Sequence, residues 1–321
     1  MQTYIETGSD GRNTSGAKMS LMKKVLCVGT NTVAVLIVSL WLPIVSYGMR
    51  LLSPVRRGFW CDDETIRYPF SRHGTVSTGM LFGCGIGIPI GFILLNEMIR
   101  YAFRRPYPCG TPCMKLQITT TGRVIGIFMF GSLLTLTITD IMKMSSGRLR
   151  PCFLYMCRPN VNLANCTGFI TDYECENKSP WVAEMRKSFP SGHASFAMYS
   201  MMFLVLYIEK RIPFSVGYLS KIILQSVCLI LAVFTGLSRT VDHMHHWEDV
   251  VVGLLLGAVI VFALKQTIPR LFDFNNDNKD ALYSPMDNVN PDIGLNVGKS
   301  SSQEPTNIQG SRMSNYRQRS V

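Results

Sequence analysis

Charge is scarce in this sequence and is confined to short segments. Asp, Glu, Lys and Arg make up 17% of the 321 residues, whereas 47% of the residues are hydrophobic. The mean hydropathy of +0.18 is high for a protein that folds in water. The long apolar runs leave too little amphipathic sequence to form water-facing surfaces, and this argues against a soluble helical bundle.

The sequence also lacks a basic patch with interleaved aromatic side chains, although its net charge is +11. Its cations are spread over the segments that flank the apolar runs, so we expect no nucleic-acid partner. Anionic lipid headgroups account more simply for this charge. We find no internal repeat. No cleavable signal peptide is evident either, because Met1–Ser20 is polar and the first apolar run is too long for one.

Six apolar runs predict an all-α polytopic membrane protein with six transmembrane helices. A membrane-spanning helix needs roughly 20 apolar residues, so the last three runs, of about 15–16, must recruit neighbouring residues. We expect residues 1–24 to form a flexible arm, 25–264 a membrane domain and 265–321 a largely disordered tail. The runs are Val25–Met49, Val76–Leu95, Val124–Ile141, Ala194–Ile208, Ile222–Leu237 and Val250–Leu264.

Cysteines and a glycosylation sequon indicate which side of the membrane each connection faces. With six spans, both termini lie on one side and the first, third and fifth connections on the other, while the charge bias is nearly indecisive. Asn165-Cys166-Thr167 is a sequon in the third connection. We therefore predict cytoplasmic termini and outward-facing or luminal odd connections, in the plasma membrane or, as the alternative, an internal membrane. The cysteines of these connections, whose pairing the sequence leaves open, are Cys61, Cys152, Cys157, Cys166 and Cys175.

Three polar segments, Lys143–Pro151, Lys187–Ser195 and Ser238–Val250, all fall in odd connections. Connections of one parity share a membrane face, so these segments can converge although they are distant in sequence. If the helix continues through the first segment, Lys143 and Arg150 share a face, because they are two turns apart. Two cations there suit a multiply charged anion. Membrane anchoring by snorkelling is the alternative.

The second segment contains Pro190-Ser191-Gly192-His193, which predicts a tight turn before a helix. Free backbone N–H groups and the helix dipole favour an anion at such a turn. Gly192 lets the backbone approach a ligand, Ser191 can donate from its hydroxyl, and His193 can exchange a proton. Alternatively, Ser191 merely caps the helix and His193 bonds to it.

The third segment places His245 and Asp249 four residues apart, together with a further cation, Arg239. On a helix, the carboxylate could hold the imidazole, fix its tautomer and leave the opposite nitrogen free as nucleophile or base. We expect no metal, because Lys143, Arg150 and Arg239 would repel a dication. The competing interpretation is a metal site built from His243, His245, His246 and Asp242 or Asp249.

Together the segments match three patterns in order: Lys, six residues, Arg-Pro; Pro-Ser-Gly-His; and Ser-Arg, five residues, His, three residues, Asp. This signature, with RGFWCDDETIRYPF in the first outer loop, resembles that of the integral-membrane lipid phosphate phosphatases, the type 2 phosphatidic acid phosphatases. The resemblance covers about Val25 to Leu264. It implies hydrolysis of phosphatidate, lysophosphatidate, sphingosine 1-phosphate or ceramide 1-phosphate at the outer or luminal face, without metal or cofactor.

The resemblance also implies residue roles. His245 would attack phosphorus to give a phosphohistidine, Asp249 would orient His245, and His193 would protonate the leaving alkoxide. Two other functions stay open: a non-catalytic protein that binds or takes up lipid phosphates, and a polyprenyl-diphosphate or sugar-phosphate phosphatase. The expected partners are membrane lipid phosphates and the bilayer, and the sequence leaves a homo-oligomer open.

The resemblance implies phosphate-binding residues as well. The phosphoryl oxygens would be bound by Lys143, Arg150, Ser191, Gly192 and Arg239.

Overall fold

The computed structural model describes residues 40–41, 44–45, 48, 53–70, 74–103, 111–163, 165–212 and 217–267. The chain divides into two compact units, Met1–Asn278 and Lys279–Val321, and every described residue belongs to the first. The predicted arm, most of the first predicted span and the tail beyond Thr267 lie outside the described residues.

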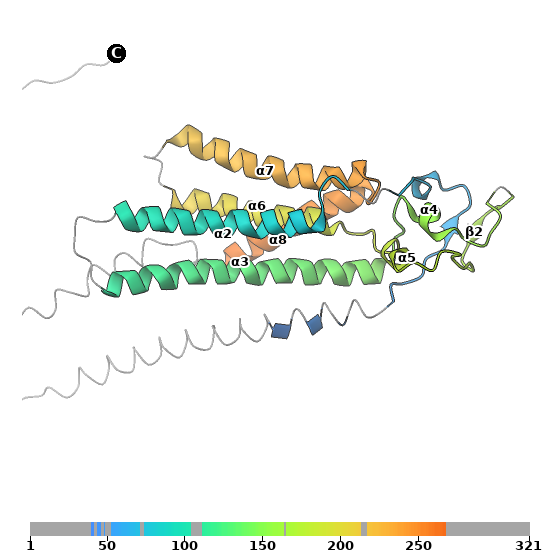
Figure 1. Cartoon of the computed structure of the whole chain (residues 1–321), viewed down its shortest axis with the longest axis horizontal. Helices are drawn as coiled ribbons and strands as arrows, with labels where there is room; N and C mark the ends of the chain where they lie inside the picture. The colour runs from blue at the N-terminus through green and yellow to red at the C-terminus, as the bar shows by residue number, and fades with distance from the viewer. Residues whose placement is uncertain are drawn as a thin grey trace, which may run out of the picture. The chain divides into compact units, whose positions relative to one another are not determined.

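Five long helices form the described part of the bundle, and they correspond to the second to sixth predicted spans (Figure 1). The predicted all-α fold class is therefore confirmed. Among these helices, α2, α3, α7 and α8 are long and apolar enough to cross a membrane. The last three helices have 20, 24 and 21 residues, so each extends beyond its apolar run as expected. The helices are α2 (Thr78–Phe103), α3 (Thr111–Ser146), α6 (Gly192–Arg211), α7 (Tyr218–Val241) and α8 (Trp247–Thr267).

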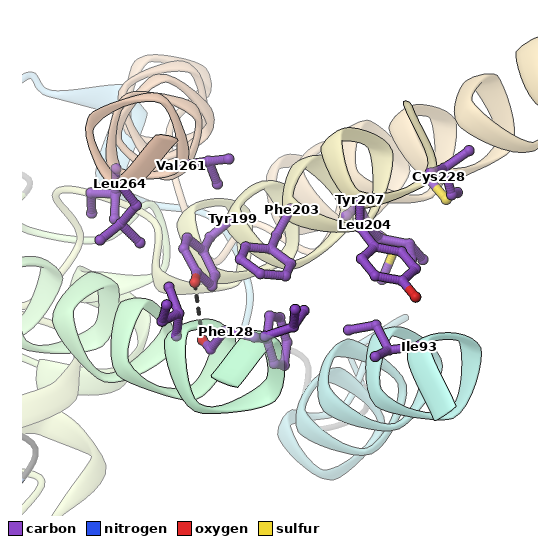
Figure 2. Close-up of a cluster of buried hydrophobic side chains, with 14 of the residues drawn as sticks. Ile93, Phe128, Tyr199, Phe203, Leu204, Tyr207, Cys228, Val261 and Leu264 are labelled. Atoms are coloured by element: carbon purple, nitrogen blue, oxygen red, sulfur yellow. Dashed lines mark hydrogen bonds between the residues drawn. The ribbon is translucent and has the colours of Figure 1, made fainter. Parts of the chain in front are cut away.

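Helix α6 is the central element, because α2, α3, α7 and α8 all pack against it. Its aromatic side chains Tyr199, Phe203 and Tyr207 are almost completely buried, and Figure 2 shows them between the neighbouring helices. The Tyr199 hydroxyl donates a hydrogen bond to the carbonyl of Phe128 in α3 at 2.9 Å. Since protein surrounds α6, this helix can carry buried polar residues that a lipid-facing helix would expose to hydrocarbon.

Close contact between α6 and α8 depends on a glycine. A Cβ at Gly257 of α8 would overlap the backbone carbonyl of Ser195 in α6. Small residues let helix backbones approach closely inside a membrane, where packing has to replace the hydrophobic effect as the source of association. The approach matters for the site, because the first turns of α6 and α8 carry residues of two of the three polar segments.

A small cap covers one end of the bundle; we define it as the described residues of 53–70 and 147–188 (Figure 1). Strands β1 (Phe59–Trp60) and β2 (Phe169–Ile170) pair antiparallel, with Phe59 opposite Ile170. Aromatic side chains of Phe59, Phe153 and Tyr173 pack edge to face in its core. The cap also contains three short helices, η1 (Glu64–Ile66), α4 (Phe153–Cys157) and α5 (Trp181–Glu184).

Two disulfides, Cys61–Cys166 and Cys157–Cys175, hold the cap together. The first joins the two segments of the cap across 105 residues of sequence. The remaining cysteine of the cap, Cys152, is unpaired and buried. The pairing that the sequence left open is therefore settled by the spatial arrangement of the cap.

Far from the cap, a buried ion pair connects α2 to the end of α6. Glu97, which is 4% exposed, accepts hydrogen bonds from Arg211 Nε at 2.5 Å and Nη2 at 2.8 Å. Tyr207 donates to the same carboxylate at 2.8 Å, and Gln117 of α3 donates to it as well. This cluster compensates the buried charges and ties three helices together.

We predict that Glu97→Gln destabilises the bundle strongly. Removing one member of a buried ion pair leaves the other charge uncompensated, which costs about 3–5 kcal/mol. Thermal unfolding of the purified protein in detergent measures the effect. Glu248→Gln is the matched control, because both side chains of the Arg148–Glu248 ion pair are partly exposed, at 32% and 42%. Equal losses of stability in both variants would contradict the assigned importance of Glu97.

Candidate active site

A cavity of about 790 Å³ lies at the cap end of the bundle, and residues of all three polar segments line it. These residues come from the last turns of α3 and α7, the first turn of α6, the cap and the loop before α8. The convergence that connection parity predicted is thus present in the folded chain. The cavity-lining members of the predicted site are Lys143, Arg150, Gly192, His193, Arg239 and His245.

The helix that carries Lys143 does not continue to Arg150, so the conditional expectation of a shared helical face is wrong. Helix α3 ends at Ser146, and Gly147 adopts a positive φ of 57°. A Cβ at this position would overlap the carbonyl oxygen of Val55. The glycine turns the chain at the helix end, and Arg150 is then anchored by a hydrogen bond from its own backbone N–H to the carbonyl of Met185 at 2.8 Å.

Two buried polar atoms in the cavity wall have no hydrogen-bond partner among the described residues: Arg150 Nε and His193 Nε2. Buried polar groups are almost always paired, so these atoms suit a ligand that carries several oxygen atoms. Burial lowers the pKa of the Arg150 guanidinium, and the Glu184 carboxylate, 4.0 Å away, opposes that shift.

The second segment begins α6 through a serine cap. The Ser191 hydroxyl accepts the Ala194 N–H at 3.5 Å, and the Ser191 N–H donates to the Asp249 carbonyl at 2.9 Å. Ser191 is fully buried and lies outside the cavity lining, whereas Gly192 is in the lining. A Cβ on Gly192 would stand 3.4 Å from Lys143 Nζ, which places the start of α6 directly beside a cation.

Arg239 and His245 come from the end of α7 and the following loop. Arg239 Nη2 donates to Asp242 at 2.5 Å. His245 is 3% exposed, and its Nδ1 lies 2.7 Å from the carbonyl oxygen of Ser188. A carbonyl only accepts, so Nδ1 carries the hydrogen and Nε2 is left with a lone pair.

The predicted partner of His245, Asp249, lies close by but not in direct hydrogen-bond contact. Its Oδ2 is 3.8 Å from His245 Nδ1, beyond hydrogen-bond distance. The Asp249 side chain is fully buried and accepts instead from the Ser188 hydroxyl at 2.6 Å, Arg148 Nη1 at 2.7 Å and the His246 N–H at 3.1 Å.

Ser188 and Arg148 are therefore site residues that sequence reasoning did not single out. Both lie inside the polar segments, but neither occupies a fixed position of the matched patterns. Ser188 acts partly through its backbone carbonyl, which leaves no signature in residue type. The sequence offers one indication of Arg148, because the segment Lys143–Pro151 contains this second arginine besides Arg150.

The histidines of the third segment do not gather into a metal-binding set. In the part of the chain that the structure describes, no group of three or more His, Cys, Asp or Glu side chains could hold a metal ion. The His243 ring stacks on Tyr68 of the cap with 4.3 Å between ring centroids. His243 thus points to the cap, whereas Nδ1 of His245 and Nδ1 of His246 lie 3.8 Å and 3.4 Å from Asp249 Oδ2.

Four of the described helices are long and apolar enough to cross a membrane, and the cavity at one end of the bundle is lined by cations and histidines. This combination suits a membrane protein whose ligand carries negative charge. Residues 124–273 match the PAP2 superfamily. No solved structure matches the chain.

Curated relatives identify the family. The chain is 36% identical to phospholipid phosphatase 2 of Mus musculus over 208 residues, which are 65% of this chain and 74% of the relative. It is 35% identical to phospholipid phosphatase 1 of Rattus norvegicus over 229 residues, which are 71% of this chain and 80% of the relative. The chain therefore belongs to the phospholipid phosphatase family of the PAP2 superfamily.

We predict that protonation of His245 couples folding to pH. Burial lowers the pKa of His245 to about 3, although Asp249 opposes the shift. Between the ordinary value of 6.5 and about 3, the unfolded chain binds a proton that the folded chain does not, so stability falls as pH falls through this window. The loss amounts to about 2 kcal/mol at a pH near 5.

Thermal unfolding in detergent between neutral pH and about pH 5 measures this effect. His245→Gln lacks the imidazole, so its stability is expected to fall less steeply than that of wild type. Identical slopes for the two proteins would contradict a depressed pKa at His245.

Proposed function

We propose that the chain hydrolyses phosphate monoesters of membrane lipids, such as phosphatidate, lysophosphatidate, sphingosine 1-phosphate and ceramide 1-phosphate, to give the dephosphorylated lipid and phosphate. As a member of the phospholipid phosphatase family, it is a phosphatase. The observation that carries the proposal is one cavity lined by Lys143, Arg150, Arg239, His193 and His245. The three cations balance the charge of a phosphate, and the histidines provide a nucleophile and a proton donor.

A lipid substrate is favoured by the apolar side chains in the cavity lining. They come from the first turns of α2 and the segment before it, from α3 and from the cap. A lipid phosphate could place its headgroup against the cations and its hydrocarbon against these apolar side chains, which a sugar phosphate would not use. The apolar lining includes Phe70, Val76, Leu81, Phe82, Leu136 and Trp181.

In the proposed mechanism, His245 Nε2 attacks phosphorus. A P–N bond forms while the ester P–O bond breaks. The negative charge of the bound phosphate offsets Lys143, Arg150 and Arg239, which allows His193 to hold a proton and to give it to the leaving alkoxide. The Ser188 carbonyl supports this step, because it keeps the hydrogen on Nδ1 of the resulting phosphohistidine. Water, deprotonated by His193, then attacks phosphorus: a P–O bond forms while the P–N bond breaks, which releases phosphate and returns the lone pair to His245 Nε2.

Charge on the transferring phosphoryl group is stabilised by Lys143, Arg150 and Arg239. Gly192 contributes its backbone at the start of α6, where the helix dipole favours an anion. Ser191 shapes this turn through its cap, and Asp249 helps to position His245. In this proposal the cations supply the positive charge that a metal ion would otherwise provide, so hydrolysis continues in the presence of a chelator.

Phosphate release from phosphatidate in detergent micelles, with excess chelator, tests the function. We expect wild type to release phosphate and His245→Ala to lose at least about a thousandfold in kcat, because the nucleophile is removed. His243→Ala is the matched control from the same loop, since its ring packs on Tyr68. Activity abolished by chelator would indicate a metal. No release by wild type from any lipid phosphate would favour a binding protein.

We also propose that the cavity faces the cell exterior or an organelle lumen. Two disulfides in the cap support an oxidising compartment. Asn165 is exposed in the cap and available to a glycan. A second sequon, Asn177-Lys178-Ser179, is present there, but the Asn177 amide donates to the Met156 carbonyl and accepts from the Ser179 N–H.

Endoglycosidase treatment of the cell-expressed protein tests this orientation. We predict a shift in electrophoretic mobility that Asn165→Gln abolishes and Asn177→Gln leaves unchanged. Asn13-Thr14-Ser15 is a further sequon in the amino-terminal arm. Glycan attached at Asn13 would put that arm outside and contradict the proposed orientation.

A further inference from the structure

Arg148 contacts the buried carboxylate of the site from outside the cavity. It follows the Gly147 turn, its side chain is 32% exposed, and it is absent from the cavity lining. Its Nη1 lies 2.7 Å from Asp249 Oδ1, and its Nη2 lies 3.3 Å from Glu248 Oε2. Arg148 thus lies outside the cavity lining, and its contacts are with Asp249 and Glu248.

The Asp249 carboxylate depends on this contact for charge compensation. Its side chain is fully buried, and a buried carboxylate is costly unless a cation or several donors pair with it. Among the described residues, Arg148 is the only Lys or Arg side chain within 4.0 Å of Asp249. The Ser188 hydroxyl and the His246 N–H supply neutral hydrogen bonds.

Asp249 is connected to His245 through Ser188. The Ser188 hydroxyl donates to Asp249 Oδ2 at 2.6 Å, and the Ser188 carbonyl accepts from His245 Nδ1 at 2.7 Å. The Ser188 N–H also donates to the backbone carbonyl of Arg148 at 2.9 Å. Ser188 is therefore held on one side by the Arg148 backbone and on the other by the carboxylate that the Arg148 side chain fixes.

We infer that Arg148 is a positioning residue for the nucleophile. Its guanidinium holds the Asp249 carboxylate in place, and this carboxylate, through Ser188, orients His245 so that Nε2 faces phosphorus. The inference rests on the proposed function and adds a residue that is not a fixed position of the Lys, six residues, Arg-Pro pattern. A substitution at Arg148 keeps the backbone hydrogen bond between the Ser188 N–H and the carbonyl of residue 148, and it removes only the contact between the guanidinium and Asp249.

A positioning role predicts a distinct kinetic effect. Without the guanidinium, Asp249 and Ser188 lose their fixed positions, and the His245 ring is no longer oriented correctly for attack. Phosphate binding is retained, because the three cations of the cavity are unchanged. We expect Arg148→Ala to lower kcat by about 10–100-fold, the usual cost of removing a residue that orients a functional ligand, with KM within about twofold of wild type.

The experiment compares kcat and KM of full-length wild type, Arg148→Ala, Arg148→Lys and Glu248→Gln with phosphatidate in detergent micelles. Arg148→Lys should recover part of kcat, because lysine restores the charge but not the forked contact. Glu248→Gln should behave like wild type, since Glu248 is 42% exposed. Guanidinium ion added at low concentration should raise kcat of Arg148→Ala, because the site of the lost side chain is partly open to solvent.

Three results would overturn the inference: kcat of Arg148→Ala within twofold of wild type, a raised KM with unchanged kcat, or an equal loss of kcat in Glu248→Gln. If Arg148→Ala does not fold, Arg148→Gln replaces it with the same expectations, because glutamine keeps a hydrogen-bond donor without the charge.

Phosphate release by wild type distinguishes failure of the proposed function from failure of the role assigned to Arg148. An inactive wild type refutes the proposed function and the role of Arg148 with it, whereas an active wild type with an unaffected variant refutes the role alone.

Discussion

The hydrogen bond between His245 Nδ1 and the Ser188 carbonyl decides which ring nitrogen is available for chemistry. A carbonyl cannot donate, so the imidazole keeps its hydrogen on Nδ1 and its lone pair on Nε2. Asp249 holds the Ser188 hydroxyl and, through its own carbonyl, the N–H of Ser191 at the start of α6. His245 and the turn at the start of α6 are thereby connected to the same residue, Asp249, in the first turn of α8.

The fold supplies rigidity on both sides of this arrangement. Helix α6 is enclosed by four other helices, and the close approach at Gly257 holds its first turns against α8. The disulfide Cys61–Cys166 joins the two segments that form the cap. At the opposite end, the buried pair of Glu97 and Arg211 fixes α2 to α6. The loops that carry the cations therefore extend from elements that cannot shift independently.

Much of this architecture could be predicted from the sequence, because apolar runs and connection parity are properties of the chain itself. Those patterns predicted the helices of the second to sixth spans and the convergence of three distant segments, which line one cavity. The turn at Gly147 could not be predicted, since residue spacing does not reveal a left-handed backbone. The role of the Ser188 carbonyl was hidden for a related reason: every residue has a carbonyl. Disulfide pairing likewise depends on distances that only the folded cap defines.

Covalent phosphorylation of His245 can be tested by trapping the phosphohistidine. Wild-type protein is mixed with phosphatidate carrying radioactive phosphate, quenched in alkali within milliseconds, and digested so that the labelled residue can be located. We predict alkali-stable label on His245. Label on another residue such as His193 or Ser191, or turnover with no trapped label under any quench, would contradict it.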